Sequence, residues 1–227
     1  MQSQVFFWLP KIDHRPEGVR NHNTQKVNAS VIQQLKSLPR KQTSLLLIAM
    51  FLSGIAYRPF QIYLSSYAKT NLTSEETVSA YSWMIIGAVG MVSGLAVGYL
   101  ADKISIRRGI MFVCTLMSLS CGFLILGAER DASLFFYLSS FLFGASFYPI
   151  FGLFPAYISR CYSQKSAALA FSFGNFALGA GGVIGNFVGG VTVDMTGSFT
   201  LAYLIMLISV VFSLVVVAFF PKEDAHD

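Results

Sequence analysis

The sequence predicts an all-α membrane protein whose six transmembrane helices form an inverted repeat of three plus three. Three observations lead to this fold class. Hydrophobic residues make up 54% of the 227 residues and charged residues only 12%, about half the charged share of a soluble domain. Six apolar segments are long enough to cross a bilayer. Two of these segments carry the same ladder of small residues at a constant offset.

The composition excludes a soluble globular domain, a disordered chain and a typical nucleic-acid-binding protein, so we expect no nucleic-acid partner. The net charge is +5, but the basic residues lie in loops beside apolar segments, where they determine topology. The three cysteines show neither a CxxC pattern nor a Cys/His cluster, and we interpret them as packing residues. We therefore expect no metal site and no cofactor.

The chain divides into three regions by composition. Residues 1–43 are expected to be a basic cytoplasmic linker, whose first ten residues look like the tail of a helix with a missing beginning. Residues 44–221 form the predicted bundle, and residues 222–227 a cytoplasmic tail. Each predicted span has at least 20 residues, enough to cross roughly 30 Å at 1.5 Å per residue. The spans are Ser44–Tyr67, Thr77–Ala101, Gly109–Ala128, Ala132–Ser159, Ser166–Val193 and Met195–Pro221.

The distribution of Lys and Arg predicts the orientation. If residues 11–43 are cytoplasmic, 13 of the 16 Lys and Arg lie on that side and two, Lys69 and Arg130, on the other. The remaining one, Arg58, is inside a span. This asymmetry follows the positive-inside rule, so both termini are expected in the cytoplasm.

Two glycine ladders predict the repeat. The second span contains Gly90, Gly94 and Gly98 followed by Asp102, and 92 residues later the fifth span contains Gly182, Asn186 and Gly190 followed by Asp194. The fifth span also carries Gly181, Gly185 and Gly189. Small residues four apart let another helix approach closely, so Gly90, Gly94, Gly98, Gly181, Gly185 and Gly189 are candidate helix-packing positions. Opposite orientation of the two ladders is typical of an inverted repeat; two independent packing faces are the alternative.

The residues from Gly98 to Arg108 (GYLADKISIRR) resemble the cytoplasmic signature GxLaDrxGrr of the major facilitator superfamily. Ser105 stands where the family usually has glycine, and Ile106 where a basic residue is common. Gly189-Gly190-x-x-x-Asp194-x-Thr196-Gly197 resembles the end of the eleventh helix of that family. Within it the pattern looks most like the bacterial YbfB-type carriers, and this resemblance implies a plasma membrane, the inner membrane of a bacterium.

The resemblance implies that residues 44–221 are the second six-helix half of a secondary transporter that works by alternating access. Asp102, with Lys103, Arg107 and Arg108, would then form a conformational latch that differs between transporter states. The alternative is that these cations only set topology. The resemblance also implies three partners: the lipid bilayer, a second six-helix bundle and a small solute. The glycine faces of the second and fifth spans would then be the sliding contacts between the two bundles.

Arg58 is the charged residue inside a span, and burial of a cation at bilayer depth is costly. It is followed by Pro59, and we expect it to face a solute cavity with Gln61 and Asn175, where a guanidinium would favour an organic anion. The alternative is that Arg58 lies nearer the outer surface and reaches the headgroups.

We expect no enzymatic activity, because the sequence contains no catalytic motif and no Asp, Glu or His within the span interiors. The predicted function is secondary transport of a small solute, with a second half required. The alternative is a membrane protein that does not transport, either a regulatory half-transporter or a truncated fragment.

Overall fold

A computed structural model describes residues 38–72, 75–130 and 132–223. By its internal contacts the chain divides into the units Met1–Ser37 and Leu38–Asp227, and the second unit is the helical bundle. The linker predicted for residues 1–43 lies mostly outside the described residues. These form six helices that are long and apolar enough to cross a membrane, as predicted. The helices are α2 (Arg40–Asn71), α3 (Glu75–Ile104), α4 (Ile106–Glu129), α5 (Ser133–Cys161), α6 (Gln164–Thr196) and α7 (Thr200–Ala218).

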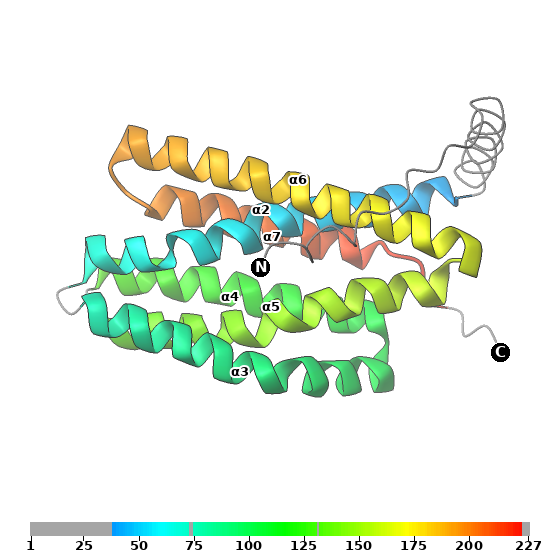
Figure 1. Cartoon of the computed structure of the whole chain (residues 1–227), viewed down its shortest axis with the longest axis horizontal. Coiled ribbons are helices and arrows are strands. Elements are labelled where there is room, and N and C mark those ends of the chain that lie inside the picture. Colours follow the sequence, from blue (N-terminus) through cyan, green and yellow to red (C-terminus); the bar gives the residue numbers. More distant parts are fainter. Residues whose placement is uncertain (1–37, 73–74, 131, 224–227) are drawn as a thin grey trace, which may run out of the picture. The chain divides into compact units, whose positions relative to one another are not determined.

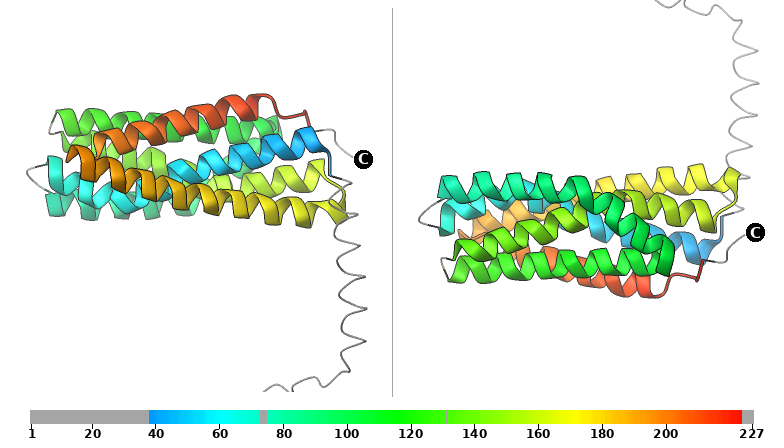
Figure 2. Two further views of the ribbon diagram at one scale, coloured as in Figure 1. Left: turned by 90° about the horizontal axis from the view of Figure 1, so that it is seen from above. Right: turned by 90° about the horizontal axis from the view of Figure 1, so that it is seen from below.

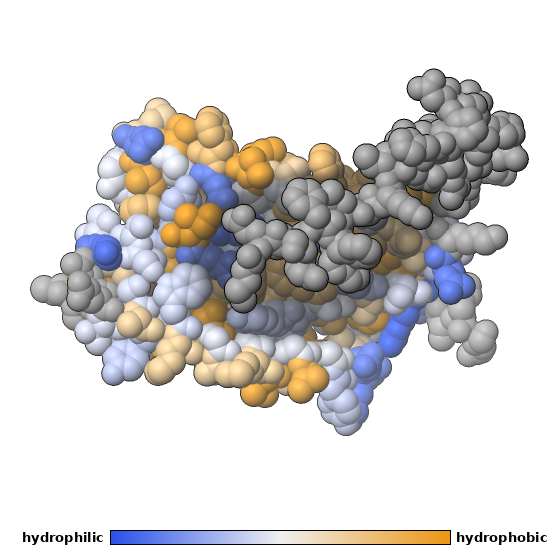
Figure 3. Space-filling model, in the orientation of Figure 1, coloured by the Kyte–Doolittle hydropathy of each residue, from blue (hydrophilic) through white to orange (hydrophobic). Residues whose placement is uncertain are grey.

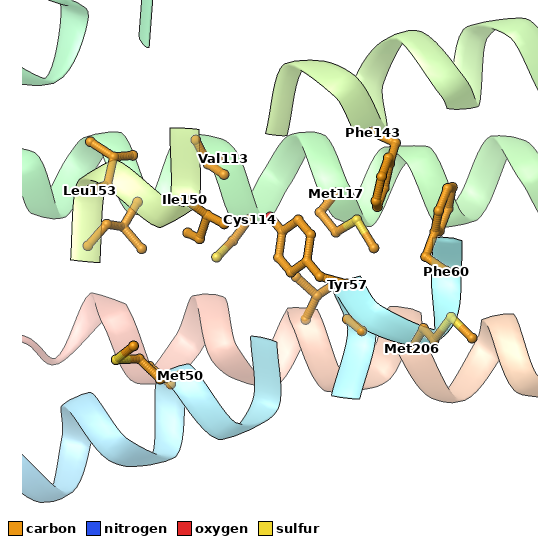
Figure 4. Close-up of a cluster of buried hydrophobic side chains, with 14 of the residues drawn as sticks. Met50, Tyr57, Phe60, Val113, Cys114, Met117, Phe143, Ile150, Leu153 and Met206 are labelled. Carbon is orange, nitrogen blue, oxygen red and sulfur yellow. The ribbon is translucent and has the colours of Figure 1, made fainter. Parts of the chain in front are cut away.

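The helices lie in three pairs. Helices α3 and α6 occupy one side of the bundle, α4 and α7 the opposite side, and α2 and α5 run between them (Figures 1 and 2). The core is aromatic and sulfur-rich where α2 and α5 meet α4 and α7 (Figure 4). Phe60 of α2 stacks on Phe143 of α5 with ring centroids 4.1 Å apart. Stacking and burial of such large rings stabilise the packing of α2 against α5.

The packing of the helices follows the predicted repeat. Helix α2 packs most extensively on α6, and α5 packs in the same way on α3. Likewise α2 packs on α7 as α5 packs on α4, and α4 meets α7. This pattern is unchanged when α2, α3 and α4 are exchanged with α5, α6 and α7. The exchange is the two-fold relation of an inverted repeat, so the predicted fold class is confirmed.

Individual contacts repeat as well. Gly54 of α2 faces the carbonyl oxygen of Leu178 in α6, where an added Cβ would clash. Gly144 of α5 faces the carbonyl oxygen of Ile86 in α3, where an added Cβ would lie 2.8 Å away. The two glycines are 90 residues apart and the two carbonyl residues 92 apart. Each repeat therefore has one close backbone crossing, and glycine makes it possible.

The third helix of each repeat has an equivalent hydrogen bond. Ser120 Oγ of α4 donates to the carbonyl oxygen of Ser139 at 2.8 Å. Ser213 Oγ of α7 donates to the carbonyl oxygen of Ala49 at 3.1 Å. Ala49 and Ser139 are 90 residues apart, and the two donors 93 apart. The repeat thus includes all three helix pairs.

The last helix begins later than its apolar segment predicts. The expected span began at Met195, but α6 continues to Thr196 and α7 begins at Thr200. Gly197 ends α6 with φ +68°, and its N–H donates to the carbonyl of Val193 at 2.8 Å. Glycine adopts this left-handed conformation without steric cost, which makes it a common helix terminator. Hydrophobicity continues through the turn, so the segment itself did not show the boundary.

Candidate functional site

One broad face of the bundle is exposed and mostly apolar. Helices α3 and α6 are the least buried of the six spans, and large apolar side chains project from them, including Met91, Leu95, Phe176, Phe187 and Met195. Figure 3 views the molecule from this side, and hydrophilic side chains interrupt the apolar surface. A surface of this kind suits lipid or another apolar helical surface.

Arg58 lies exposed in the interior of α2 at its crossing with α6. The aliphatic stem of Arg58 lies against Gly182, where an added Cβ would come within 2.8 Å of Arg58 Cγ. In the described part of the chain no hydrogen bond or ion pair engages the guanidinium. A cation with its stem packed and its charge uncompensated is available to a ligand.

The repeat gives the depth of Arg58. Tyr57 of α2 and its equivalent Phe147 of α5 contact each other, with ring centroids 6.1 Å apart. Residues related by a two-fold axis can touch only near that axis, and in an inverted repeat the axis lies in the membrane plane. Arg58 directly follows Tyr57 and is therefore close to the middle of the bundle's depth. This geometry favours the cavity interpretation over a side chain at the membrane surface.

In the described structure no hydrogen bond joins the other two cavity candidates to Arg58, although Gln61 follows Arg58 by three residues in α2 and so lies near it on the helix surface. Gln61 is half-buried and Asn175 is exposed on α6. Asn175 lies seven residues before Gly182, about 10 Å along the helix. Another polar side chain of α6 is nearer: Asn186 is one turn beyond Gly182, and its buried Oδ1 has no hydrogen-bond partner in the described structure. Such a group usually has a water or ligand partner.

The glycine ladders have different environments. Gly181, Gly185 and Gly189 lie against Phe51, Ile55 and Tyr63 of α2, so this face is already occupied within the bundle. It is not free to slide against a second bundle, contrary to our expectation for α6.

On α3, Gly90 lies against the ring of Tyr148, whereas Gly94 and Gly98 have open space beside them. The two open glycines line a crevice of about 200 Å³ between α3 and α5, whose α5 wall includes Tyr148 and Gly152. Of the two ladders, only the α3 ladder retains free surface.

At the basic end of the bundle, where α3 meets α4 and α5 meets α6, Asp102 pairs with a residue that we did not predict. Arg160, near the end of α5, donates from Nη2 to Asp102 Oδ1 at 2.8 Å. The two side chains are 46% and 66% exposed, so this ion pair contributes at most about 1 kcal/mol. A weak pair suits a contact that forms and breaks.

At this end of the bundle, Glu223 contacts both Arg160 and the start of α4. Its side chain is only 7% exposed and lies 3.8 Å from Arg160 Nη1. The carboxylate accepts hydrogen bonds from the backbone N–H of Ile106 at 3.0 Å, the N–H of Arg107 and the hydroxyl of Ser105. These donors lie at the N-terminus of α4, where the backbone N–H groups would otherwise lack hydrogen-bond partners. The dipole of the helix also favours a negative charge at this end.

The other three predicted latch residues do not bind Asp102. Lys103 lies over the ring of Tyr99 at 4.4 Å, and Arg107 Nη1 donates to the carbonyl oxygen of Phe220 at 2.9 Å. Arg108 is exposed. All three line a cavity of about 680 Å³ together with Asp102, Arg160, Lys222 and Glu223.

Ser105 occupies the turn where the family signature usually has glycine. Its φ is 148°, and it is the non-glycine residue with positive φ in the described chain. The tight turn is therefore made despite the serine, at a conformational cost of order 1–3 kcal/mol.

Sequence signals for Arg160 and Glu223 are weak, because an ion pair between distant helix ends leaves no local spacing pattern.

Comparisons with known proteins agree with this architecture. The family model described as Major Facilitator Superfamily matches residues 4–177, which include α2 to α5 and the first part of α6. Over 146 residues, 62% of this chain, the sequence is 27% identical to a Bacillus subtilis (strain 168) protein named "Uncharacterized MFS-type transporter YcxA". The match spans 36% of that relative, so the aligned part of this chain covers about a third of the relative's length. The six-helix repeat and the family match together lead to one conclusion: this chain belongs to the major facilitator superfamily.

Proposed function

We propose that the bundle is one half of a secondary transporter that works by alternating access with a second six-helix bundle. The solute would bind where the two bundles face each other, near the membrane midplane. Two observations support the need for a partner: the broad apolar face of α3 and α6, and the limited share of the curated relative that the chain spans. The YbfB-type branch remains a prediction.

The proposed solute site is built around Arg58, whose guanidinium would bind a small organic anion. The guanidinium is exposed at mid-depth and lacks a partner in the described structure. An arginine in this setting binds a carboxylate with two parallel hydrogen bonds. Asn186, one helical turn beyond Gly182 on α6, supplies a further polar group near the site. Its buried Oδ1 is an acceptor without a partner in the described structure, so it suits a hydrogen-bond donor such as a water and not the carboxylate itself.

The contacts at the basic end support a conformational latch in which Arg160, and not the predicted cations, is the partner of Asp102. We propose that Asp102 and Arg160 form a state-dependent contact, supported by Glu223, while Lys103, Arg107 and Arg108 keep this end cytoplasmic by the positive-inside rule. With that orientation both termini are cytoplasmic and the membrane is a plasma membrane, the inner membrane of a bacterium.

The test is anion binding by the full chain in lipid nanodiscs, measured by equilibrium dialysis with labelled acetate and benzoate, and with benzylamine as the cationic control. We expect binding of an anion and none of the amine. Arg58→Ala should abolish this binding, and Arg58→Lys should weaken it, because an ammonium cannot form the paired hydrogen bonds. Binding of acetate or benzoate that is equal in wild type and Arg58→Ala would remove Arg58 from the site.

The alternative is a regulatory half-transporter that binds another carrier and transports nothing. Its supporting observation is the same apolar face. It predicts that Arg58→Ala is harmless, while Gly94→Leu or Gly98→Leu, which fill the open α3 surface, abolish association with the partner. The mass of the complex, measured by immunoblot after mild crosslinking in native membranes, distinguishes the associated from the lone chain.

A further inference from the structure

We propose that the solute site extends from Arg58 across the two-fold axis to Tyr148, and that it takes a monocarboxylate with an aromatic body. The inference rests on the proposed function of Arg58. It adds a residue that determines specificity and a narrower solute class.

The sequence around Tyr148 repeats the sequence around Arg58. In α2, Gly54 is followed after three residues by Arg58 and Pro59, and in α5, Gly144 is followed after three residues by Tyr148 and Pro149. The offset is 90 residues at each position, the offset that relates Gly54 to Gly144 and Ala49 to Ser139 in the structure. Arg58 and Tyr148 are therefore structural equivalents that differ in chemistry.

The two side chains also occupy equivalent sites. The stem of Arg58 lies against Gly182 of α6, and the ring of Tyr148 lies against Gly90 of α3. These glycines are themselves equivalents, 92 residues apart. Because a side chain at either glycine would clash, each notch lets a long side chain lie flat on the neighbouring helix. Tyr148 is 45% exposed, and Arg58 is exposed too.

Both residues flank the two-fold axis at the same depth. Each follows a residue close to the axis: Tyr57 precedes Arg58 and Phe147 precedes Tyr148, and the rings of Tyr57 and Phe147 are in contact. A two-fold operation about that contact carries Arg58 onto the Tyr148 position. A solute at the centre of this face thus has the guanidinium on one side and the phenol on the other.

The chemistry of the two sides defines the solute. On this half of the site Arg58 supplies one positive charge, and the other span interiors of this chain contain no Lys or Arg, so this half pairs with a single carboxylate. The opposite side is aromatic: Tyr148 contacts Phe147 edge to face at 5.3 Å, and Phe147 contacts Phe151 at 5.0 Å. Phe151 is 43% exposed. Such a surface favours stacked or edge-on contact with a flat ring.

The experiment compares benzoate with cyclohexanecarboxylate, which has the same charge and nearly the same size but no π-system. Their dissociation constants are measured by dialysis with the full chain in nanodiscs, for wild type, Tyr148→Phe and Tyr148→Leu. Tyr99→Leu, at an exposed tyrosine of α3, is the matched control. The folded state of each variant is checked by its elution from a gel-filtration column.

We expect wild type to prefer benzoate about fivefold or more, as one aromatic contact allows. Tyr148→Phe should keep this ratio, Tyr148→Leu should reduce it to near one, and Tyr99→Leu should leave it unchanged. A ratio that is unaffected by Tyr148→Leu, while Arg58→Ala still abolishes binding, would overturn this inference and leave the proposed function intact. Anion binding that survives Arg58→Ala would overturn the proposed function itself. Stronger binding of cyclohexanecarboxylate by wild type would also contradict the aromatic assignment.

Discussion

Arg160 and Asp102 join the ends of α5 and α3 through a hydrogen-bonded ion pair of 2.8 Å, although 58 residues separate them in the chain. Arg160 also approaches Glu223, which holds the N-terminus of α4. One arginine thus connects three helix ends at the basic end of the bundle.

We predict that Arg160→Ala loosens this end without unfolding the protein. Because both members of the pair are well exposed, the free energy of unfolding should fall by at most about 1 kcal/mol. Amide hydrogen exchange at residues 102–108 should become several times faster. The control is Lys103→Ala, whose ammonium lies on the Tyr99 ring and not on Asp102. Unchanged exchange in Arg160→Ala would show that the pair does not restrain the turn.

Glu223→Ala should destabilise the bundle more than any other single change at this end. The carboxylate is almost fully buried and accepts two backbone N–H groups at the start of α4. Loss of a helix cap together with charge-assisted hydrogen bonds costs about 1–3 kcal/mol. Thermal unfolding in detergent measures this loss, and Lys222→Ala is the neighbouring control. Equal unfolding temperatures for the two variants would contradict the capping role.

Ser105 offers a test of backbone strain. Ser105→Gly and Ser105→Ala both remove the hydroxyl that donates to Glu223, so the comparison isolates the cost of φ 148°. Glycine adopts this conformation freely, and alanine does not. Ser105→Gly should be more stable than Ser105→Ala by about 1–2 kcal/mol in the same unfolding assay. If alanine proved equal or better, the turn would not require a glycine-like conformation.

Two glycines of α6 provide a matched pair of substitutions. At Gly181 a Cβ would clash with the carbonyl oxygen of Phe51, whereas Gly179 has open space. Alanine is favoured over glycine inside a helix by about 1 kcal/mol, so Gly179→Ala should raise the unfolding temperature. Gly181→Ala should lower it, because α2 and α6 must move apart. A lower unfolding temperature for Gly179→Ala than for Gly181→Ala would contradict the close crossing.

The sequence predicts part of the candidate site. It identifies Arg58 as a candidate because a charged residue within an apolar span is a local and unusual feature. The equivalence of Arg58 and Tyr148 could also have been read from the sequence, since Gly-x-x-x-Arg-Pro and Gly-x-x-x-Tyr-Pro are 90 residues apart. It was missed because the two residues differ in chemistry, and the glycine ladders of α3 and α6 gave a more obvious match.

The sequence by itself determined the six spans and the repeat, because both depend on properties that are local: the length of an apolar segment and the spacing of small residues along one helix. Only the tertiary structure decided which surfaces are occupied. Gly181 and Gly98 belong to similar ladders, yet α2 covers Gly181 and an open crevice borders Gly98. Asp102 likewise pairs with Arg160 and not with the cations beside it. Spacing tells which residues share a helical face, but the neighbour of that face is set by how distant helices pack.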